Sequence, residues 1–161
     1  MLVVLAGCAA TPERYDAARR PADFSLRVTL EAAGGAQGQG VKAQDVDELP
    51  TEPGQYVVMP DRELRVALGP GATADVYPGR TAVLSPQEMD ELWRRTVEAW
   101  RSTRHASSQA QDSQRSASIA LRVRFRGAGR SRSFTTSLRD PAGRSLAAWL
   151  VSMRGGEGLG T

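Results

Sequence analysis

Residues 119–138, IALRVRFRGAGRSRSFTTSL, alternate apolar and polar side chains on either side of a glycine-rich break. A period of two marks a strand that buries one face, and a short break between two such runs marks a hairpin. Placing Phe134 on the same face as Val123 fixes the pairing register of the two strands. The opposite face then carries three arginines beside three hydroxyl side chains: Arg122, Arg124 and Arg126 with Ser131, Ser133 and Thr135.

Three more strand patterns lie upstream of this hairpin. Residues 24–30 alternate from Phe24 to Leu30, which predicts a lone strand with one buried face. Residues 56–59 and 64–68 flank the turn pair Pro60-Asp61 and predict a second hairpin, because proline and aspartate favour turn positions. We therefore expect about five strands in all.

Two amphipathic helices are predicted, one before the 119–138 hairpin and one after it. Ser85-Pro86-Gln87-Glu88 has the pattern of a capping box with proline at the first helical position. Asp140-Pro141 repeats the cap and the proline, and Gly155-Gly156 ends the second helix. Each helix carries one apolar stripe: Met89, Leu92, Trp93, Val97 and Trp100 in the first, and Leu146, Trp149, Leu150 and Met153 in the second. The charged opposite face of the first helix favours core packing for its tryptophans over a ligand groove.

The order of these elements predicts an α+β fold. We expect an antiparallel sheet of about five strands, in two hairpins plus a lone strand, with both helices packed on one face. Such a sheet keeps one face open to solvent. Five arginines share the predicted open face: Arg27, Arg65, Arg122, Arg124 and Arg126.

Length and composition agree with one globular domain. The chain has 161 residues, of which 40% are hydrophobic and 24% charged, and a formal net charge of +3. No run approaches the 18 or so apolar residues of a membrane-spanning helix. A single cysteine, Cys8, excludes an intramolecular disulfide.

The start of the chain carries the motif Leu5-Ala6-Gly7-Cys8, which resembles the lipobox of bacterial lipoproteins. The resemblance implies that a signal peptidase cuts before Cys8 and that the sulfur of Cys8 carries a diacylglycerol. The apolar run ahead of it is shorter than the roughly 7–15 residues of a signal core, and no Lys or Arg precedes it. We therefore expect the true start to lie upstream of Met1.

This resemblance sets the expected organisation and address of the chain. Residues 1–7 are expected to be an incomplete signal peptide, 8–22 a lipidated tether, 23–156 the single α+β domain and 157–161 a frayed tail. The protein is then anchored to a membrane of the cell envelope, the outer membrane being favoured over the inner, with its domain facing the periplasm or the exterior. The alternative is a buried strand with Cys8 as a small core residue, which would make this a soluble protein of unknown function.

Enzymatic motifs do not occur in the sequence. It has no Gly-x-Ser-x-Gly, no His-Glu-x-x-His and no second Cys or His. We therefore expect that the protein is not an enzyme and that it binds no cofactor and no metal. Acid–base chemistry by Asp or Glu alone stays open. The single histidine, His105, falls in a predicted loop over residues 102–118 and is expected to face solvent. The acidic residues 45–48 lack the spacing of a calcium loop and are expected to be solvated.

The arginines of the open face are the candidate contact surface. Arginine suits phosphate and carboxylate, so the expected partners are lipid headgroups, an acidic envelope polymer or an acidic protein, whereas nucleic acid fits the charge but not the address. Alternatively, the arginines serve solubility and edge protection, and pair with the acidic residues 45–52.

The sequence leaves two functions open. The first is a non-enzymatic binding or assembly module of the envelope. The second is an envelope-anchored regulator, because the order of helix, hairpin and short helix after residue 84 is similar to that of emfourin-type inhibitors of thermolysin-like metalloproteases.

Overall fold

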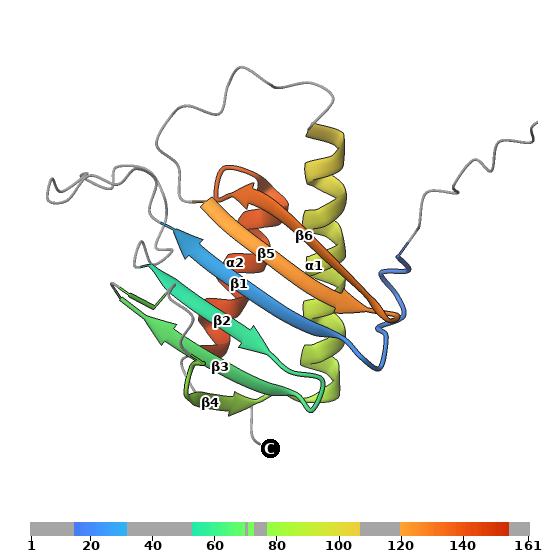
Figure 1. Ribbon diagram of the computed structural model, residues 1–161. Coiled ribbons are helices and arrows are strands. Elements are labelled where there is room, and N and C mark those ends of the chain that lie inside the picture. Colours follow the sequence, from blue (N-terminus) through green and yellow to red (C-terminus); the bar gives the residue numbers. More distant parts are fainter. Residues whose placement is uncertain (1–14, 32–52, 70, 73–76, 107–119, 155–161) are drawn as a thin grey trace, which may run out of the picture.

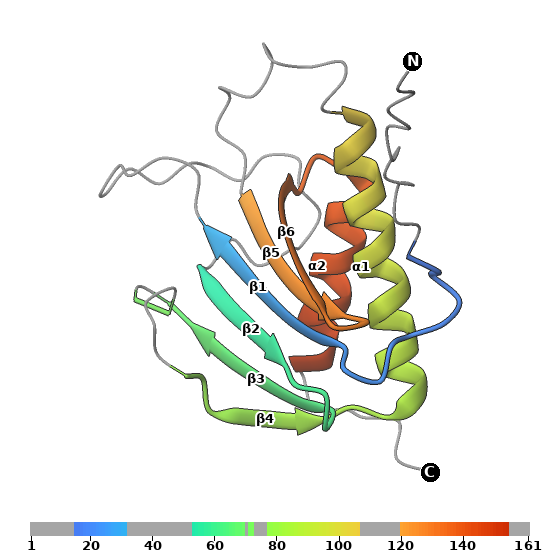
Figure 2. The ribbon, with the colours of Figure 1, turned by 45° about the vertical axis from the view of Figure 1, so that its right-hand side comes forward.

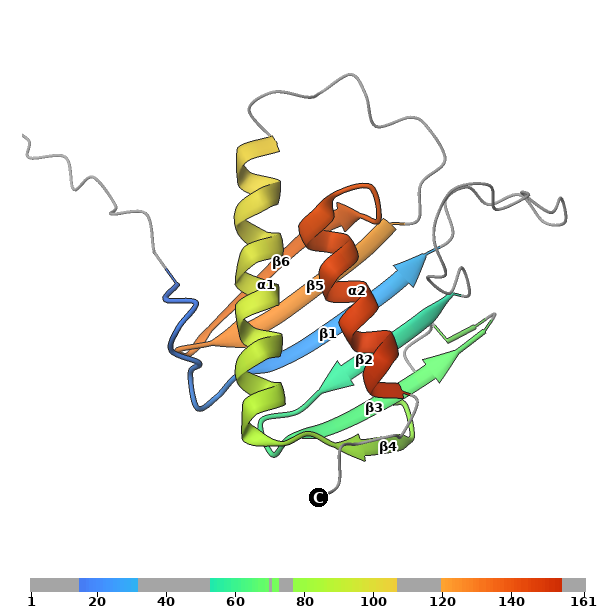
Figure 3. The ribbon, with the colours of Figure 1, turned by 180° about the vertical axis from the view of Figure 1, so that it is seen from behind.

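A computed structural model describes residues 15–31, 53–69, 71–72, 77–106 and 120–154. These residues form one antiparallel sheet with two helices packed on a single face, which confirms the predicted α+β class (Figures 1 and 3). The elements are β1 (Ser25–Glu31), β2 (Gly54–Val58), β3 (Glu63–Leu68), β4 (Arg80–Val83), α1 (Pro86–Ala106), β5 (Ala120–Gly127), β6 (Arg130–Ser137) and α2 (Pro141–Arg154).

The sheet has the strand order β4-β3-β2-β1-β5-β6, with every neighbouring pair antiparallel. Strands β1 to β4 form a meander, and α1 then carries the chain behind the sheet to β5, which pairs with the other side of β1 (Figure 2). The sheet has six strands in the described residues, where about five were expected. The additional strand is β4, which is only four residues long and shows no strict alternation in its sequence.

The β5–β6 hairpin has the register that the sequence predicts, with Val123 opposite Phe134. Its loop is Ala128-Gly129, and both residues have positive φ, 52° and 72°. Two such residues make a type I′ turn, whose twist matches that of the flanking strands. Alanine adopts this left-handed conformation at a cost, so the turn needs support from elsewhere.

Asp23, two residues ahead of β1, supports this turn. Its carboxylate accepts hydrogen bonds from the amides of Ala128 and Gly129, both at 2.7 Å. The Gly129 amide, with that of Ala128, holds the pKa of the Asp23 carboxyl below its ordinary value of 3.8, although desolvation opposes the shift. The contact therefore stabilises the fold above pH 3.8, and this contribution is lost as the pH falls through the lower folded pKa.

Both helices begin where the sequence predicts. The Ser85 hydroxyl accepts from the Glu88 amide at 3.2 Å, and the Glu88 carboxylate accepts from the Ser85 amide at 2.6 Å, which completes a capping box. At α2, the Asp140 carboxylate accepts from the Gly143 amide at 3.0 Å. A Cβ at Gly143 would lie 2.6 Å from the backbone oxygen of Ser137, so α2 lies too close to the end of β6 for any larger residue.

The core lies between the sheet and the two helices. Trp93, Phe125 and Phe24 are at most 1% exposed and meet edge to face, with ring centroids 5.1 Å apart for Phe24–Trp93 and 6.0 Å for Trp93–Phe125. Such pairs add about 0.5–1.5 kcal/mol each beyond the burial of their surface. The tryptophans of α1 are thus used for core packing, as their helical stripe predicts.

The folded body begins earlier than residue 23. Tyr15 is 9% exposed, and its ring lies edge to face with those of Trp93, Trp100 and Phe125 at centroid distances of 5.6, 5.2 and 5.4 Å. The Trp93 indole donates to the Asp16 carbonyl at 2.9 Å, and a guanidinium of α1 donates to the Tyr15 carbonyl. The expected tether over residues 8–22 is therefore wrong from Tyr15 onward, because these residues pack on the domain.

The first helix ends later than expected. α1 continues to Ala106, so the loop predicted over residues 102–118 is wrong for its first five residues. Ser102 in this last part donates to the Asp140 carboxylate at 2.8 Å, which ties it to the start of α2. The side chain of His105, the acidic residues 45–52, the lipobox with Cys8 and the tail 157–161 lie outside the described residues. Neither α1 nor α2 has the length and hydropathy needed to cross a membrane.

Candidate functional site

The five arginines expected on the open face all project from the side of the sheet that faces away from the helices. This follows from the register, because the neighbours of each arginine along its strand face the core: they belong to it, except for Val66, which is partly buried against it, and the buried Gly127. We call this surface the arginine face and define it by Arg27, Arg65, Arg122, Arg124 and Arg126.

A single row of paired residues crosses the centre of the arginine face. Arg65 of β3 lies opposite Val57 of β2, which lies opposite Arg27 of β1. Arg27 in turn lies opposite Arg124 of β5, and Arg124 opposite Ser133 of β6. Three arginines from distant parts of the chain are thus brought into one line by β-pairing.

The hydroxyl side chains of β6 border this row. Arg122 lies opposite Thr135 and Arg126 opposite Ser131, as predicted from the hairpin pattern. Thr29 of β1 lies opposite Arg122 on the other side. Hydroxyls supply further hydrogen-bond donors to any anion that the guanidinium groups attract.

The outer arginines of the face have counter-charges within the protein. Nε of Arg122 lies 2.9 Å from a carboxylate oxygen of Glu31, and Nε of Arg126 lies 3.6 Å from one of Asp23. Arg65 pairs with Glu63 at 2.5 Å and stacks on the ring of Tyr77, with its Cζ 4.5 Å from the ring centroid.

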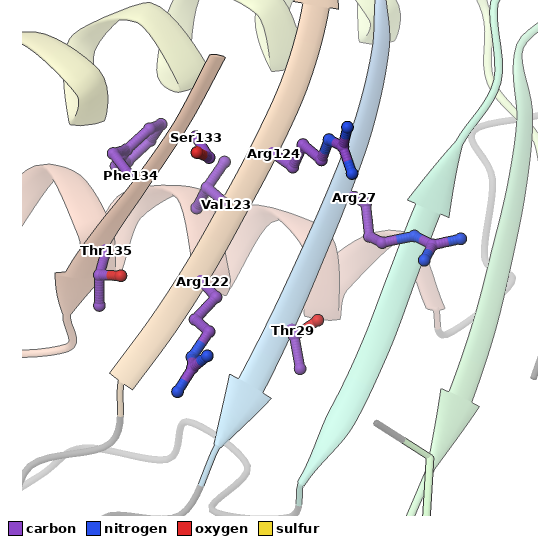
Figure 4. Close-up of a pocket in the computed structure, with 8 residues that line it drawn as sticks. All are labelled: Arg27, Thr29, Arg122, Val123, Arg124, Ser133, Phe134 and Thr135. Carbon is purple, nitrogen blue, oxygen red and sulfur yellow. The ribbon is translucent and has the colours of Figure 1, made fainter. Parts of the chain in front are cut away.

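The central two arginines differ from the outer ones. Arg27 and Arg124 are exposed and directly opposite one another, and among the described residues neither forms an ion pair or a hydrogen bond. Figure 4 shows Arg124 extending from β5 over β1, and Arg27 extending from β1 toward β2, so that the two side chains are staggered. Like charges directly opposite in a sheet are destabilising, so this pair has a cost that an external anion would relieve.

Two arginines of α1 differ from Arg27 and Arg124 because they have an acidic partner. Arg94 and Arg95 of α1 both bond to Glu91, at 2.6 and 2.7 Å. The hydrogen bond from Arg94, aided by the charge of Arg95, lowers the pKa of Glu91 to about 2. Acidic partners are therefore placed beside arginines elsewhere in this fold, but not beside Arg27 and Arg124 within the described residues.

Two shallow hollows lie on either side of the central pair, and both are lined by Arg27 and Arg124. Figure 4 shows the residues that line the larger of the two. The larger, about 410 Å³, also takes Arg122 and the hydroxyl residues Thr29, Ser133 and Thr135 into its wall. The smaller, about 320 Å³, adds Arg126, Ser131 and an apolar side made by Val57, Met59 and Tyr77. The arrangement offers positive charge and hydroxyls on one side and apolar contacts on the other.

Sequence reasoning missed the apolar side of the second hollow. Val57 could have been placed on the open face from the hairpin register, since it pairs with Arg65. Tyr77 lies in an irregular connection between β3 and β4, where no periodicity indicates which way a side chain faces. Only the packing of Tyr77 against Arg65 places it on the arginine face.

The central pair makes a prediction about stability. We expect Arg124→Gln to raise the free energy of unfolding by about 0.2–1 kcal/mol in the absence of ligand, because the repulsion from Arg27 is removed. This corresponds to a rise in Tm of about 0.5–4 °C at low ionic strength, and the rise shrinks as salt is added. Thermal unfolding followed by circular dichroism measures it, with Arg139→Gln as the control for an exposed arginine away from the sheet face. A Tm that is unchanged or lower in Arg124→Gln would contradict the prediction.

Comparison with known proteins gives no family for this chain. No protein-family model matches it, and no curated protein matches it. Among the described residues, no group of three or more His, Cys, Asp or Glu side chains is placed to hold a metal ion.

Proposed function

We propose that this protein is a non-enzymatic lipoprotein of the cell envelope, held to a membrane by a lipid on Cys8, whose arginine face binds an anionic partner. The observation that carries the binding role is the Arg27–Arg124 pair, two like charges placed opposite each other without a counter-charge among the described residues. A planar guanidinium donates two parallel hydrogen bonds to a phosphate or carboxylate, which makes arginine suited to this task.

The lining of the hollows supports binding over catalysis. Neither lining contains a carboxylate, a histidine or a cysteine among the described residues. The linings do hold Ser and Thr hydroxyls, but a hydroxyl is a weak nucleophile until an adjacent general base activates it, and neither lining supplies a carboxylate or a histidine for that purpose. Guanidinium groups stay protonated and bind anions without exchanging protons.

The anchor is tested by the intact mass of the protein, extracted in detergent from the membrane of its host. We expect a chain that begins at Cys8 and carries a diacylglycerol, with or without a further acyl chain on its amine. Cys8→Ser is the control and should yield an unacylated, unprocessed product. A wild-type protein with a free Cys8 thiol would refute the anchor.

The binding role is tested by capture from envelope extract on immobilised protein. We expect Arg27→Glu/Arg124→Glu to abolish capture of the partner, because the centre of the face reverses sign while the ion pairs of Arg122 and Arg126 are left in place. Capture by the wild type should weaken as salt is raised, since exposed charges are screened. The matched control is Arg139→Glu/Arg154→Glu, which makes the same change of net charge away from the sheet face.

Two results would count against the binding role. If Arg27→Glu/Arg124→Glu captures the same material as the wild type, the arginine face is not the contact surface. If the control loses capture equally, net charge rather than the face is responsible. Circular dichroism of each variant shows whether the fold is retained.

Protease inhibition stays a prediction from element order alone. The part of this chain whose element order is similar to that of such inhibitors is α1–β5–β6–α2. Purified protein added in equimolar amount to a thermolysin-like protease tests this role by the residual peptidase activity.

A further inference from the structure

We propose that the arginine face docks on the phosphate groups of an anionic phospholipid surface, in the membrane that holds Cys8. This inference rests on the proposed function, since it names the partner of the same face. Three features of the described residues carry it: the central arginine pair, the exposed apolar rim, and the place where the chain enters the domain.

The central pair supplies charge complementarity. Arg27 and Arg124 present two guanidinium groups at the middle of the sheet face, without a counter-charge among the described residues and with hollows on both sides of them. The phosphate of an anionic lipid is small enough to enter a shallow hollow of about 320–410 Å³ while its glycerol backbone stays outside. Ser133 and Thr29 lie in the wall of the larger hollow, where their hydroxyls can donate to phosphate oxygens.

The rim of the face carries the two large apolar side chains that are most exposed in the described residues. Tyr77 is 54% exposed and Val83 is 47% exposed. Val83 pairs with Glu63 on the open side of β4 and β3, and Tyr77 stacks on Arg65 of the same face. A tyrosine beside basic residues is typical of surfaces that meet the headgroup level of a bilayer, because its ring is apolar and its hydroxyl polar.

The entry point of the chain brings the face within reach of the membrane. Tyr15 contacts Phe125 of β5 as well as Trp93 and Trp100 of α1, so it lies at the boundary between the sheet and the helix layer. Tyr15 follows Cys8 by seven positions in the sequence, and even fully extended this stretch spans at most about 25 Å. A lipid on Cys8 therefore keeps the part of the domain around Tyr15 and β5 close to the bilayer, where a headgroup surface is the anion at highest local concentration.

The experiment separates docking of the face from insertion of the anchor. The full chain with Cys8→Ser carries no lipid, so its binding to vesicles reports the face alone. We measure its partition onto vesicles of phosphatidylcholine with a minor fraction of phosphatidylglycerol, and onto vesicles of phosphatidylcholine alone. We expect binding to the anionic vesicles only, and its loss at high salt, because each arginine near the surface acts electrostatically.

Substitution of the central pair gives the decisive comparison. In the Cys8→Ser background, Arg27→Gln/Arg124→Gln should lower the partition coefficient about thirty-fold at low salt, on a contribution of about 1 kcal/mol for each arginine. Arg139→Gln/Arg154→Gln changes net charge equally and should leave the partition coefficient unchanged. Glutamine keeps an aliphatic stem and a polar end, so the fold is retained, which the Tm of each variant verifies.

Three outcomes would overturn the inference. One is equal binding to neutral and anionic vesicles, and another is a partition coefficient that Arg27→Gln/Arg124→Gln leaves unchanged. The third is absence of vesicle binding together with capture from envelope extract that still depends on Arg27 and Arg124. In that case the partner is an acidic protein or polymer, so the lipid surface is wrong and the proposed binding function stands.

Discussion

Trp93→Ala is expected to lower the free energy of unfolding by about 3–5 kcal/mol, which is a large part of the roughly 5–15 kcal/mol that holds a domain of this size together. Trp93 is 1% exposed and its ring meets those of Tyr15, Phe24 and Phe125 edge to face. Its removal leaves a cavity between the sheet and α1 and ends the hydrogen bond to the Asp16 carbonyl. Urea unfolding followed by circular dichroism measures the loss.

Trp93→Phe is the matched control for this prediction. Phenylalanine keeps an aromatic ring at the centre of the cluster but cannot donate to the Asp16 carbonyl. We therefore expect a smaller loss, of about 1–2 kcal/mol, from one hydrogen bond and some packing. A loss below about 1 kcal/mol for Trp93→Ala would show that the cluster is not the centre of the core.

Asp140→Ala is expected to lower the free energy of unfolding by about 2–4 kcal/mol, because one carboxylate joins three elements. One oxygen accepts from the Gly143 amide and the Thr136 hydroxyl, both at 3.0 Å, and the other accepts from the Ser102 hydroxyl at 2.8 Å. Loss of a helix cap costs about 0.5–2 kcal/mol, and Thr136, at 7% exposure, is left with a buried hydroxyl that lacks this acceptor. Thermal unfolding measures the change.

Asp140→Asn tests whether acceptor geometry or charge matters at this position. Asparagine caps helices about as well as aspartate, and its carbonyl oxygen can still accept from Gly143. We expect a loss of about 1 kcal/mol, from the weakened bond to Ser102. Equal losses for the alanine and asparagine variants would contradict a capping role and point to the negative charge instead.

The sheet-forming part of the fold could be predicted because its patterns are local. Alternation in 119–138 fixes which side chains share a face, and one pairing, Val123 with Phe134, then places every other residue of the hairpin. The capping residues Ser85 and Asp140 act on amides three residues away, so short sequence patterns suffice to find both helix starts.

The features that sequence missed depend on contacts between distant residues. β4 is a strand only because β3 lies beside it, and its four residues carry no period of their own. Tyr15 lies in a segment without periodicity, and its burial is decided by rings from α1 and β5 that come about 80 to 110 residues later.

The sequence predicts only part of the candidate site, because the rest again depends on contacts between distant residues. Strand parity predicts that the five arginines share one face, but it does not predict which of them have a counter-charge. Glu31 and Asp23 lie near Arg122 and Arg126 only after β1 and β5 pair, and this leaves Arg27 and Arg124 as the uncompensated centre among the described residues. Charge pairing across a sheet is a property of the register, which a single strand does not reveal.

The burial of Tyr15 also determines how the domain would respond to force. Any pull that arrives along the chain ahead of residue 15 enters the protein at a ring lodged against Trp93, Trp100 and Phe125, with its carbonyl held by Arg101. The packed rings therefore take the load before it reaches the hydrogen bonds that join β1 to its neighbours. A pulling force on this segment is thus resisted first by the hydrophobic core, and the sheet keeps its shape until the ring contacts of Tyr15 break.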